Sequence, residues 1–214
     1  MLVVFDCDGT LVDSQHIIIE SMCTAFKQNN LPRPSDDAIR RIVGLSLRDA
    51  VQSLVENKDE FLISSIVSLY RKTFFEIRHS KRLPESLYPN VTETLDSIRK
   101  AGNVLGIATG KSRKGLIATL ESHGILDHFA TLQTADDLPG KPNPEMLYRA
   151  MKETGCKKCH TIFIGDTVFD IEMAKNAGIK GYGVSWGYHD EEELVAAGAT
   201  LVLRDIKELL PLLG

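Results

Sequence analysis

Residues 2–10 read Leu2-Val3-Val4-Phe5-Asp6-Cys7-Asp8-Gly9-Thr10. The apolar run stops at a charged residue after a few positions, which is typical of a buried strand and far short of the roughly 20 residues of a membrane span. Side chains alternate along an extended backbone, so Asp6 and Asp8 are expected on the same side. Ligands of open parallel sheets bind beyond the carboxyl ends of the strands. The segment therefore predicts a strand that delivers two carboxylates to a ligand site.

Similar apolar runs alternate with helical patterns over most of the remaining chain, which is typical of a parallel sheet covered by helices. Candidate strands are 2–5, 104–108, 131–133, 161–164, 181–184 and 200–203. Candidate helices are 91–101, 114–123, 144–154, 169–177, 191–196 and 206–210. Glycines follow several of these helices, where a left-handed C-cap is common. The pattern predicts an α/β fold.

The segment 14–84 breaks this alternation, because it shows helical periodicity and turns at Pro32, Pro34 and Gly44 but no convincing strand. We interpret it as an inserted, all-helical domain. The sheet domain would then consist of 1–13 and 85–214. Since the chain leaves and rejoins the sheet domain at neighbouring points, the two crossings would form a hinge.

A second pair of carboxylates follows the candidate strand 161–164, at Asp166 and Asp170. If Asp166 starts a helix, Asp170 lies four residues on and shares its face. Clustered carboxylates raise one another's pKa unless a cation or hydrogen bonds compensate. Oxygen ligands of this kind favour Mg²⁺, which would also take an oxygen of a substrate phosphate.

Groups suited to an anion follow two further candidate strands. The strand 104–108 leads into Thr109 and Gly110 with a helix beyond, and a hydroxyl, a backbone N–H and a helix N-terminus together favour phosphate. Lys141 supplies a positive charge in a loop that Pro142 and Pro144 stiffen. Each feature alone is commonly a cap or a solvated side chain, but all of them follow apolar strands in order.

Composition narrows the class of protein. The formal net charge of −4 provides no general field for nucleic acid, and no apolar stretch is long enough to span a membrane. Four cysteines without an export signal fit a cytoplasmic protein better than a disulfide framework. Cys156, Cys159 and His160 match the C-x-x-C-H pattern of covalent haem attachment, but chance is the better account because that attachment requires export.

The segments D-x-D-G-T, T-G-K, G-K-P-N-P and G-D-x-x-x-D resemble the motif set of the haloacid dehalogenase-like hydrolase superfamily. Their order and spacing are similar to those of its phosphoglycolate phosphatase-like branch, in which a helical cap follows the first motif. The resemblance implies a Rossmann-like core with an inserted cap. It also implies that Asp6 attacks phosphorus and that Asp8 acts as general acid and then general base.

The same resemblance implies a set of ligands. Magnesium would be held by Asp6, by the backbone carbonyl of Asp8 and by Asp166, with Asp170 as a direct or supporting group. Thr109, Gly110 and Lys141 would bind the phosphoryl oxygens. The expected partner is a small phosphorylated metabolite, with no role for nucleic acid or membrane, and both monomer and dimer remain open.

The cap must choose the substrate, since the core groups contact only phosphate. We expect Gly44 and Arg48 to contribute, with Arg48 reaching a second anionic group. Gly110 stands where bacterial phosphoglycolate phosphatases often carry Asn, so phosphoglycolate is one candidate among several. A β-phosphoglucomutase-like enzyme is the alternative, although Leu47 replaces an arginine of those enzymes and His16 lies two residues before the position of their cap histidine. A phosphate-binding regulatory module without turnover is a third possibility.

Overall fold

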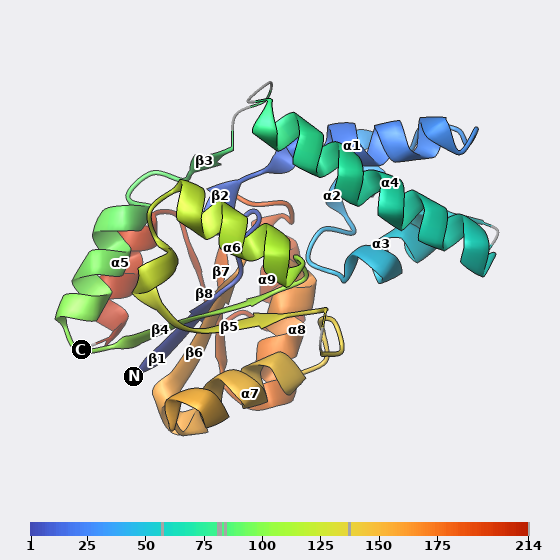
Figure 1. The fold of residues 1–214 in the computed structure, drawn as a ribbon. Helices are drawn as coiled ribbons and strands as arrows, with labels where there is room; N and C mark the ends of the chain where they lie inside the picture. Colours follow the sequence, from blue (N-terminus) through green and yellow to red (C-terminus); the bar gives the residue numbers. More distant parts are fainter. Residues whose placement is uncertain (57, 81–82, 84, 137, 214) are drawn as a thin grey trace.

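The computed structural model describes residues 1–56, 58–80, 83, 85–136 and 138–213. Its centre is a six-stranded sheet in which every neighbouring pair is parallel, which confirms the predicted α/β fold (Figure 1). The order across the sheet is β5 (Phe129–Thr134), β4 (Val104–Thr109), β1 (Leu2–Phe5), β6 (Thr161–Gly165), β7 (Lys180–Val184) and β8 (Leu201–Leu203). The strand order reverses beside β1, where ligands of such sheets bind.

Two apolar cores lie on the two faces of the sheet, because successive side chains of β1 point in opposite directions. Val3 and Phe5 pack into one core with α5 (Val91–Lys100), α6 (Arg113–Ser122) and the 3₁₀ helix η3 (Ile206–Leu213). Leu2 and Val4 pack into the other with α7 (Glu145–Thr154) and α8 (Val168–Ala177). The elements α9 (Glu191–Ala197), η1 (Leu126–His128) and η2 (Lys158–His160) complete this part of the chain.

The helices α1 (Gln15–Gln28), α2 (Asp36–Arg40), α3 (Leu47–Leu54) and α4 (Glu60–His79) lie together beside the sheet (Figure 1). They enclose an apolar core of their own, which includes Met22, Phe26 and Ile66. Between 14 and 84, the described residues contain helices and no strand. The bounds of the inserted domain stay a prediction, and its predicted end at residue 84 lies outside the described residues.

The chain enters and leaves these helices through a short antiparallel ladder that the sequence pattern did not predict. It pairs β2 (Val12–Asp13) with β3 (Ser86–Leu87), joining Val12 to Leu87 and Asp13 to Ser86. Two-residue strands carry no periodicity that a pattern could reveal. The ladder therefore ties the two crossings to each other.

Two further details concern the sequence predictions. The predicted helix at 206–210 is part of the longer 3₁₀ helix η3, and Pro211 within it lacks the N–H that a continuing α-helix needs. Cys159 and His160 lie in η2 at the amino end of β6, on the edge of the sheet opposite the carboxyl ends of the strands. Within the described ranges, no helix combines the length and apolarity that a bilayer crossing requires.

Candidate active site

Three adjacent central strands deliver polar side chains to one edge of the sheet. Asp6 directly follows β1, Thr109 ends β4, and Asp166 directly follows β6. The backbone N–H of Asp6 still donates to the carbonyl of Ile164 at 2.8 Å, which extends the β1 to β6 ladder by one residue. All three side chains are buried, so their positions are fixed by the core beneath them.

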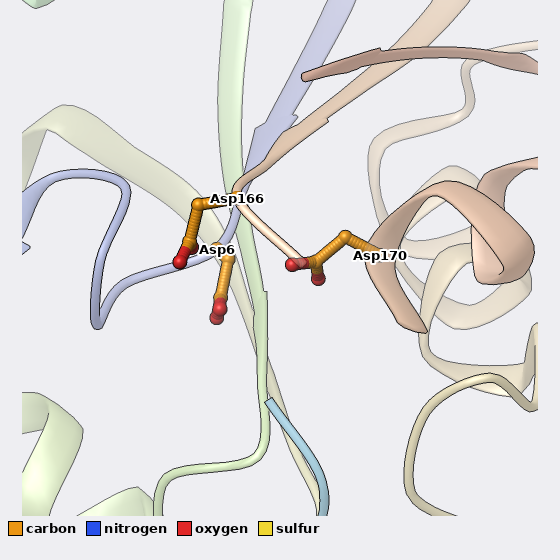
Figure 2. A group of neighbouring side chains, drawn as sticks. All are labelled: Asp6, Asp166 and Asp170. Atoms are coloured by element: carbon orange, nitrogen blue, oxygen red, sulfur yellow. The ribbon is translucent and has the colours of Figure 1, made fainter. Parts of the chain in front are cut away.

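Asp6, Asp166 and Asp170 gather at this edge, with one carboxylate oxygen of each lying within 4.8 Å of the others. Figure 2 shows Asp6 and Asp166 extending side by side from the strand ends, while Asp170 reaches toward them from α8. The carboxylate of Asp8 does not belong to this group. Any contribution of Asp8 to a metal would therefore come from its backbone, as the family resemblance implies.

Asp166 and Asp170 do not meet by sharing a helix face, so that part of the sequence prediction is wrong. Helix α8 begins at Val168 with Thr167 as its N-cap, and Asp166 precedes it. Asp170 Oδ2 accepts hydrogen bonds from the backbone N–H and the hydroxyl of Thr167, at 3.0 and 2.7 Å. This capping box turns Asp170 back toward the strand end and so toward Asp166.

Lys141 lies between two of the carboxylates and is buried with them. Its Nζ is 2.9 Å from Asp6 Oδ1 and 2.6 Å from Asp170 Oδ1. Burial alone would lower the pKa of Lys141, but the charges of Asp170 and Asp6 raise it above its usual value. Lys141 is therefore a fixed cation at neutral pH between the two carboxylates.

Asp166 is oriented by two donors and two glycines. Thr10 Oγ1 donates to its Oδ1 at 2.7 Å, and the backbone N–H of Tyr188 donates to its Oδ2 at 3.0 Å. A Cβ at Gly187 would lie 2.1 Å from the Cβ of Asp166, and a Cβ at Gly9 would lie 2.2 Å from Asp166 Oδ2. The close approach of both loops requires glycine at these positions.

The electrostatics of the cluster suit a divalent cation. Burial raises the pKa of Asp6 to about 6, with Lys141 opposing this and Asp170 adding to it. Burial, and then the charges of Asp170 and Asp6, raise the pKa of Asp166 well above its usual value. Ionised carboxylates held this close are unfavourable without a further positive charge, and an all-oxygen set favours a hard cation. The residues present therefore fit the metal that the sequence predicted.

Asp8 is held apart from the cluster by two donors that the sequence analysis did not assign. Ser14 Oγ donates to Asp8 Oδ1 at 2.6 Å, and Lys111 Nζ contacts the same oxygen at 2.7 Å. Both bonds go to Oδ1, so Oδ2 is the oxygen that the contacts of the described residues leave for a ligand. A carboxyl group with one oxygen anchored and the other available is suited to proton transfer.

Lys111 belongs to a chain of charges that reaches the helices of the inserted segment. Its Nζ is 3.9 Å from Glu85 Oε1, and Glu85 Oε2 is 3.0 Å from Nε of Arg78 near the end of α4. Lys111 lies 103 residues from Asp8 in sequence. Lys111 is the last residue of the T-G-K motif, but the motif does not predict its contact with Asp8. The packing of the strands brings the ammonium group there.

The expected anion site at 109–112 differs from the sequence prediction in one respect. Among the first-turn N–H groups of α6, that of Gly115 is bound by Ser112 Oγ and that of Arg113 by Asp136 Oδ2. These donors are already occupied by protein acceptors. Thr109 and Gly110 are therefore better placed than the helix terminus to hold a phosphate.

A loop of the helical segment also packs against Gly110. A Cβ there would lie 2.3 Å from the carbonyl oxygen of Leu45 and 2.8 Å from that of Gly44. Both atoms belong to backbone, so they cannot turn away as a flexible side chain would. Gly44 itself has φ +99° and faces Thr167, which places the loop against both motif segments.

Gly110→Ala is expected to lower kcat/KM at least about tenfold, equivalent to about 1.4 kcal/mol, because the methyl group pushes the 44–45 loop off the core. The melting temperature should fall as well, because the clashing atoms are backbone and the contact can be relieved only by displacing the loop. Steady-state kinetics and thermal unfolding of the purified variant measure both quantities. A variant with kcat/KM within twofold of wild type would show that this loop contact does not matter for turnover.

The two cap residues that the sequence singled out differ in their surroundings. Gly44 and Arg48 both line a cavity that also reaches Asp6, Asp8 and Thr109. Arg48 is about half exposed and is paired with Glu60 of α4. Its charge is therefore partly compensated within the helical segment before any ligand arrives.

Comparison with known proteins agrees with this geometry. The family model described as haloacid dehalogenase-like hydrolase matches residues 3–184. The chain is 32% identical to the pyrophosphatase PpaX of Bacillus velezensis, over 99% of this chain and 95% of that protein. It is also 32% identical to the phosphoglycolate phosphatase of Vibrio parahaemolyticus, over 98% and 94% of the two chains.

A solved structure, a predicted phosphoglycolate phosphatase from Haemophilus somnus, superposes with a TM-score of 0.89 at 26% identity and covers 100% of this chain and 97% of that one. The match extends through the sheet and the helical segment alike. Fold, motif order and sequence identity agree, so this chain belongs to the haloacid dehalogenase-like hydrolase family.

Proposed function

We propose that this protein is a magnesium-dependent phosphatase that hydrolyses a small phosphomonoester through a phosphoaspartate on Asp6. The observation that carries the proposal is the pairing of a buried Asp6, beside Lys141, with a separate Asp8 that is anchored through one oxygen. Relatives named as phosphatases support the same reaction class. Because another relative is named as a pyrophosphatase, the names of the relatives do not identify the leaving group.

The reaction follows from the positions of Asp6 and Asp8. The Asp6 carboxylate attacks phosphorus while the bond to the leaving oxygen breaks, and Asp8 gives that oxygen a proton. Water then attacks the phosphoaspartate, Asp8 takes its proton, and the bond between Asp6 and phosphorus breaks to release inorganic phosphate. Asp8 needs to be neutral in the first step and charged in the second, so it must stay apart from the clustered carboxylates.

Thr109, Gly110 and Lys141 would hold the phosphoryl oxygens during both steps. Lys141 supplies charge, while the hydroxyl of Thr109 and the backbone N–H of Gly110 supply donors fixed by the strand end. Such preorganised groups stabilise charge that spreads over the oxygens of an in-line transition state.

Magnesium would be held by Asp6, by Asp166 and by the backbone carbonyl of Asp8. When bound, it would neutralise charge on the nucleophile and on the phosphoryl group. Both oxygens of Asp170 are already engaged, one by Lys141 and the other by Thr167. We therefore assign Asp170 to positioning Lys141 rather than to direct ligation.

Hydrolysis is favoured over the mutase alternative by the surroundings of the cavity. A mutase must hold a sugar and keep water from its phosphoaspartate. His16 is exposed and is not among the residues that line the cavity, while Leu47 lines it without offering a hydrogen bond. With β-glucose 1-phosphate as substrate, we expect little glucose 6-phosphate.

Metal removal tests the proposed function. Exhaustive chelation is expected to reduce phosphate release from p-nitrophenyl phosphate at least about 100-fold, and added Mg²⁺ should restore it. Calcium should not substitute, because its longer bonds and higher coordination number misplace the reacting groups. Full activity with Ca²⁺ alone, or activity that survives chelation, would contradict the site.

A further inference from the structure

The cavity above Asp6 and Asp8 is much larger than a small phosphorylated acid requires. Its volume is about 850 Å³, and it extends from the carboxylates to helices α1, α3 and α4. Phosphoglycolate and pyrophosphate have about nine non-hydrogen atoms each. At about 30 Å³ per atom, the volume of a water molecule in the liquid, either would fill roughly a third of the space.

An aromatic wall stands beside the group that would protonate the leaving oxygen. The Phe74 ring centroid lies 4.7 Å from Lys111 Nζ, which itself contacts Asp8 at 2.7 Å. Tyr70 stacks on Phe74 with ring centroids 5.9 Å apart. Tyr70 and Asp8 line the same cavity, and desolvation, followed by the charges of Asp8 and Glu85, raises the pKa of Tyr70.

Aliphatic side chains continue this wall away from the carboxylates. Ile18 and Met22 of α1 and Leu47 of α3 line the same cavity. Ile18 and Met22 are buried in the core of the helical segment, so the wall is rigid on that side. A leaving group that departs from phosphorus toward Asp8 therefore meets an apolar surface of defined shape.

Most of the arginine and lysine side chains that line the cavity are paired with carboxylates and not free for a second anionic group. Four of them face carboxylates: Arg48 faces Glu60, Arg71 faces Asp136, Arg78 faces Glu85, and Lys111 faces Asp8 and Glu85. The remaining lysines of the lining, Lys72 and Lys114, are exposed. An anionic leaving group such as phosphate or glycolate gains little from such a site.

We propose that the substrate is a phosphomonoester whose leaving group carries an aromatic or comparably bulky apolar portion, which packs against Tyr70 and Phe74. This inference rests on the proposed phosphatase function and specifies its substrate class. It follows from the apolar wall beside Asp8, from the unused volume and from the neutralised cations.

A series of substrates with leaving alcohols of similar acidity separates binding from intrinsic reactivity. Ethyl phosphate and 3-phenylpropyl phosphate meet this condition, and phosphoglycolate and pyrophosphate serve as the small, charged comparison. With Mg²⁺ present, we expect kcat/KM for 3-phenylpropyl phosphate to exceed that for each of the other three at least about tenfold, since apolar pocket contacts are worth about 10- to 200-fold.

Variants of α4 test whether Phe74 causes the preference for 3-phenylpropyl phosphate. Phe74→Ala is expected to reduce the ratio of kcat/KM between 3-phenylpropyl and ethyl phosphate about tenfold, and Phe74→Leu should retain part of it. Phe61 lies on the same helix, is 84% exposed and does not line the cavity, so Phe61→Ala is the matched control and should leave the ratio unchanged. Melting temperatures of all variants show whether each remains folded.

These measurements distinguish failure of the apolar subsite from failure of the proposed phosphatase function. If phosphoglycolate or pyrophosphate is hydrolysed with the higher kcat/KM, the apolar subsite is wrong while the phosphatase stands. The subsite is equally wrong if Phe74→Ala and Phe74→Leu both keep the wild-type ratio. If none of the four substrates releases phosphate with Mg²⁺, the proposed function fails and the substrate class fails with it.

Discussion

The Asp6→Asn variant is expected to lose at least about 10³-fold in kcat, a loss of about 4 kcal/mol of transition-state stabilisation. The amide has nearly the size of the carboxylate, but it cannot attack phosphorus. In addition, the neutral amide oxygen is a weaker ligand for Mg²⁺ than the anionic carboxylate oxygen. Both effects act on the chemical step, so the loss should be the largest of any substitution at the site.

The fold should survive this change. Asp6 is 1% exposed, and burial raises its pKa to about 6, so asparagine removes a charge that the surroundings disfavour. Lys141 keeps Asp170 as a partner at 2.6 Å. Circular dichroism and the melting temperature should stay close to wild type. A folded variant with activity within tenfold of wild type would show that Asp6 is not the nucleophile.

Lys141→Met is expected to lower both activity and stability. Removing one partner of a buried ion pair typically costs about 3–5 kcal/mol, because the remaining charges lose their compensation. Here Asp6 and Asp170 would be left facing each other without the ammonium group. Methionine has a similar length and no branch, so packing alone should suffer little.

The measurements are thermal unfolding in the absence of Mg²⁺ and steady-state phosphate release in its presence. Lys152→Met, on the exposed surface of α7, is the control for loss of a lysine and should behave as wild type. If Lys141→Met melts at the wild-type temperature and keeps its kcat, the buried ion pairs have no energetic role. The fixed cation of the phosphate site would then have to be another residue.

Local features of the sequence were sufficient to predict the sheet and its helices. Apolar runs that end at Asp6, Thr109 and Asp166 correspond to β1, β4 and β6. Gly155 and Gly178 are left-handed C-caps of α7 and α8, as predicted. These features depend on residues within a few positions of one another, and such local preferences are what a single sequence records.

Features that depend on distant residues could not be predicted in the same way. Nothing near Asp8 in sequence indicates that Lys111 contacts it, and nothing near Gly110 indicates that the carbonyl of Leu45 lies against it. The cause is the packing of the strands in the first case and the packing of the helical segment on the sheet in the second.

Trapping the covalent intermediate tests the nucleophile most directly. The protein is mixed with substrate and Mg²⁺, quenched in acid during turnover, and reduced with borohydride, which converts a phosphoaspartate to homoserine. Trypsin then releases residues 1–27, because Lys27 is the first lysine or arginine of the chain. Tandem mass spectrometry of this peptide should find homoserine at position 6 in wild type and none in Asp6→Asn. Homoserine at any other aspartate, or at none during active turnover, would contradict the assignment of Asp6.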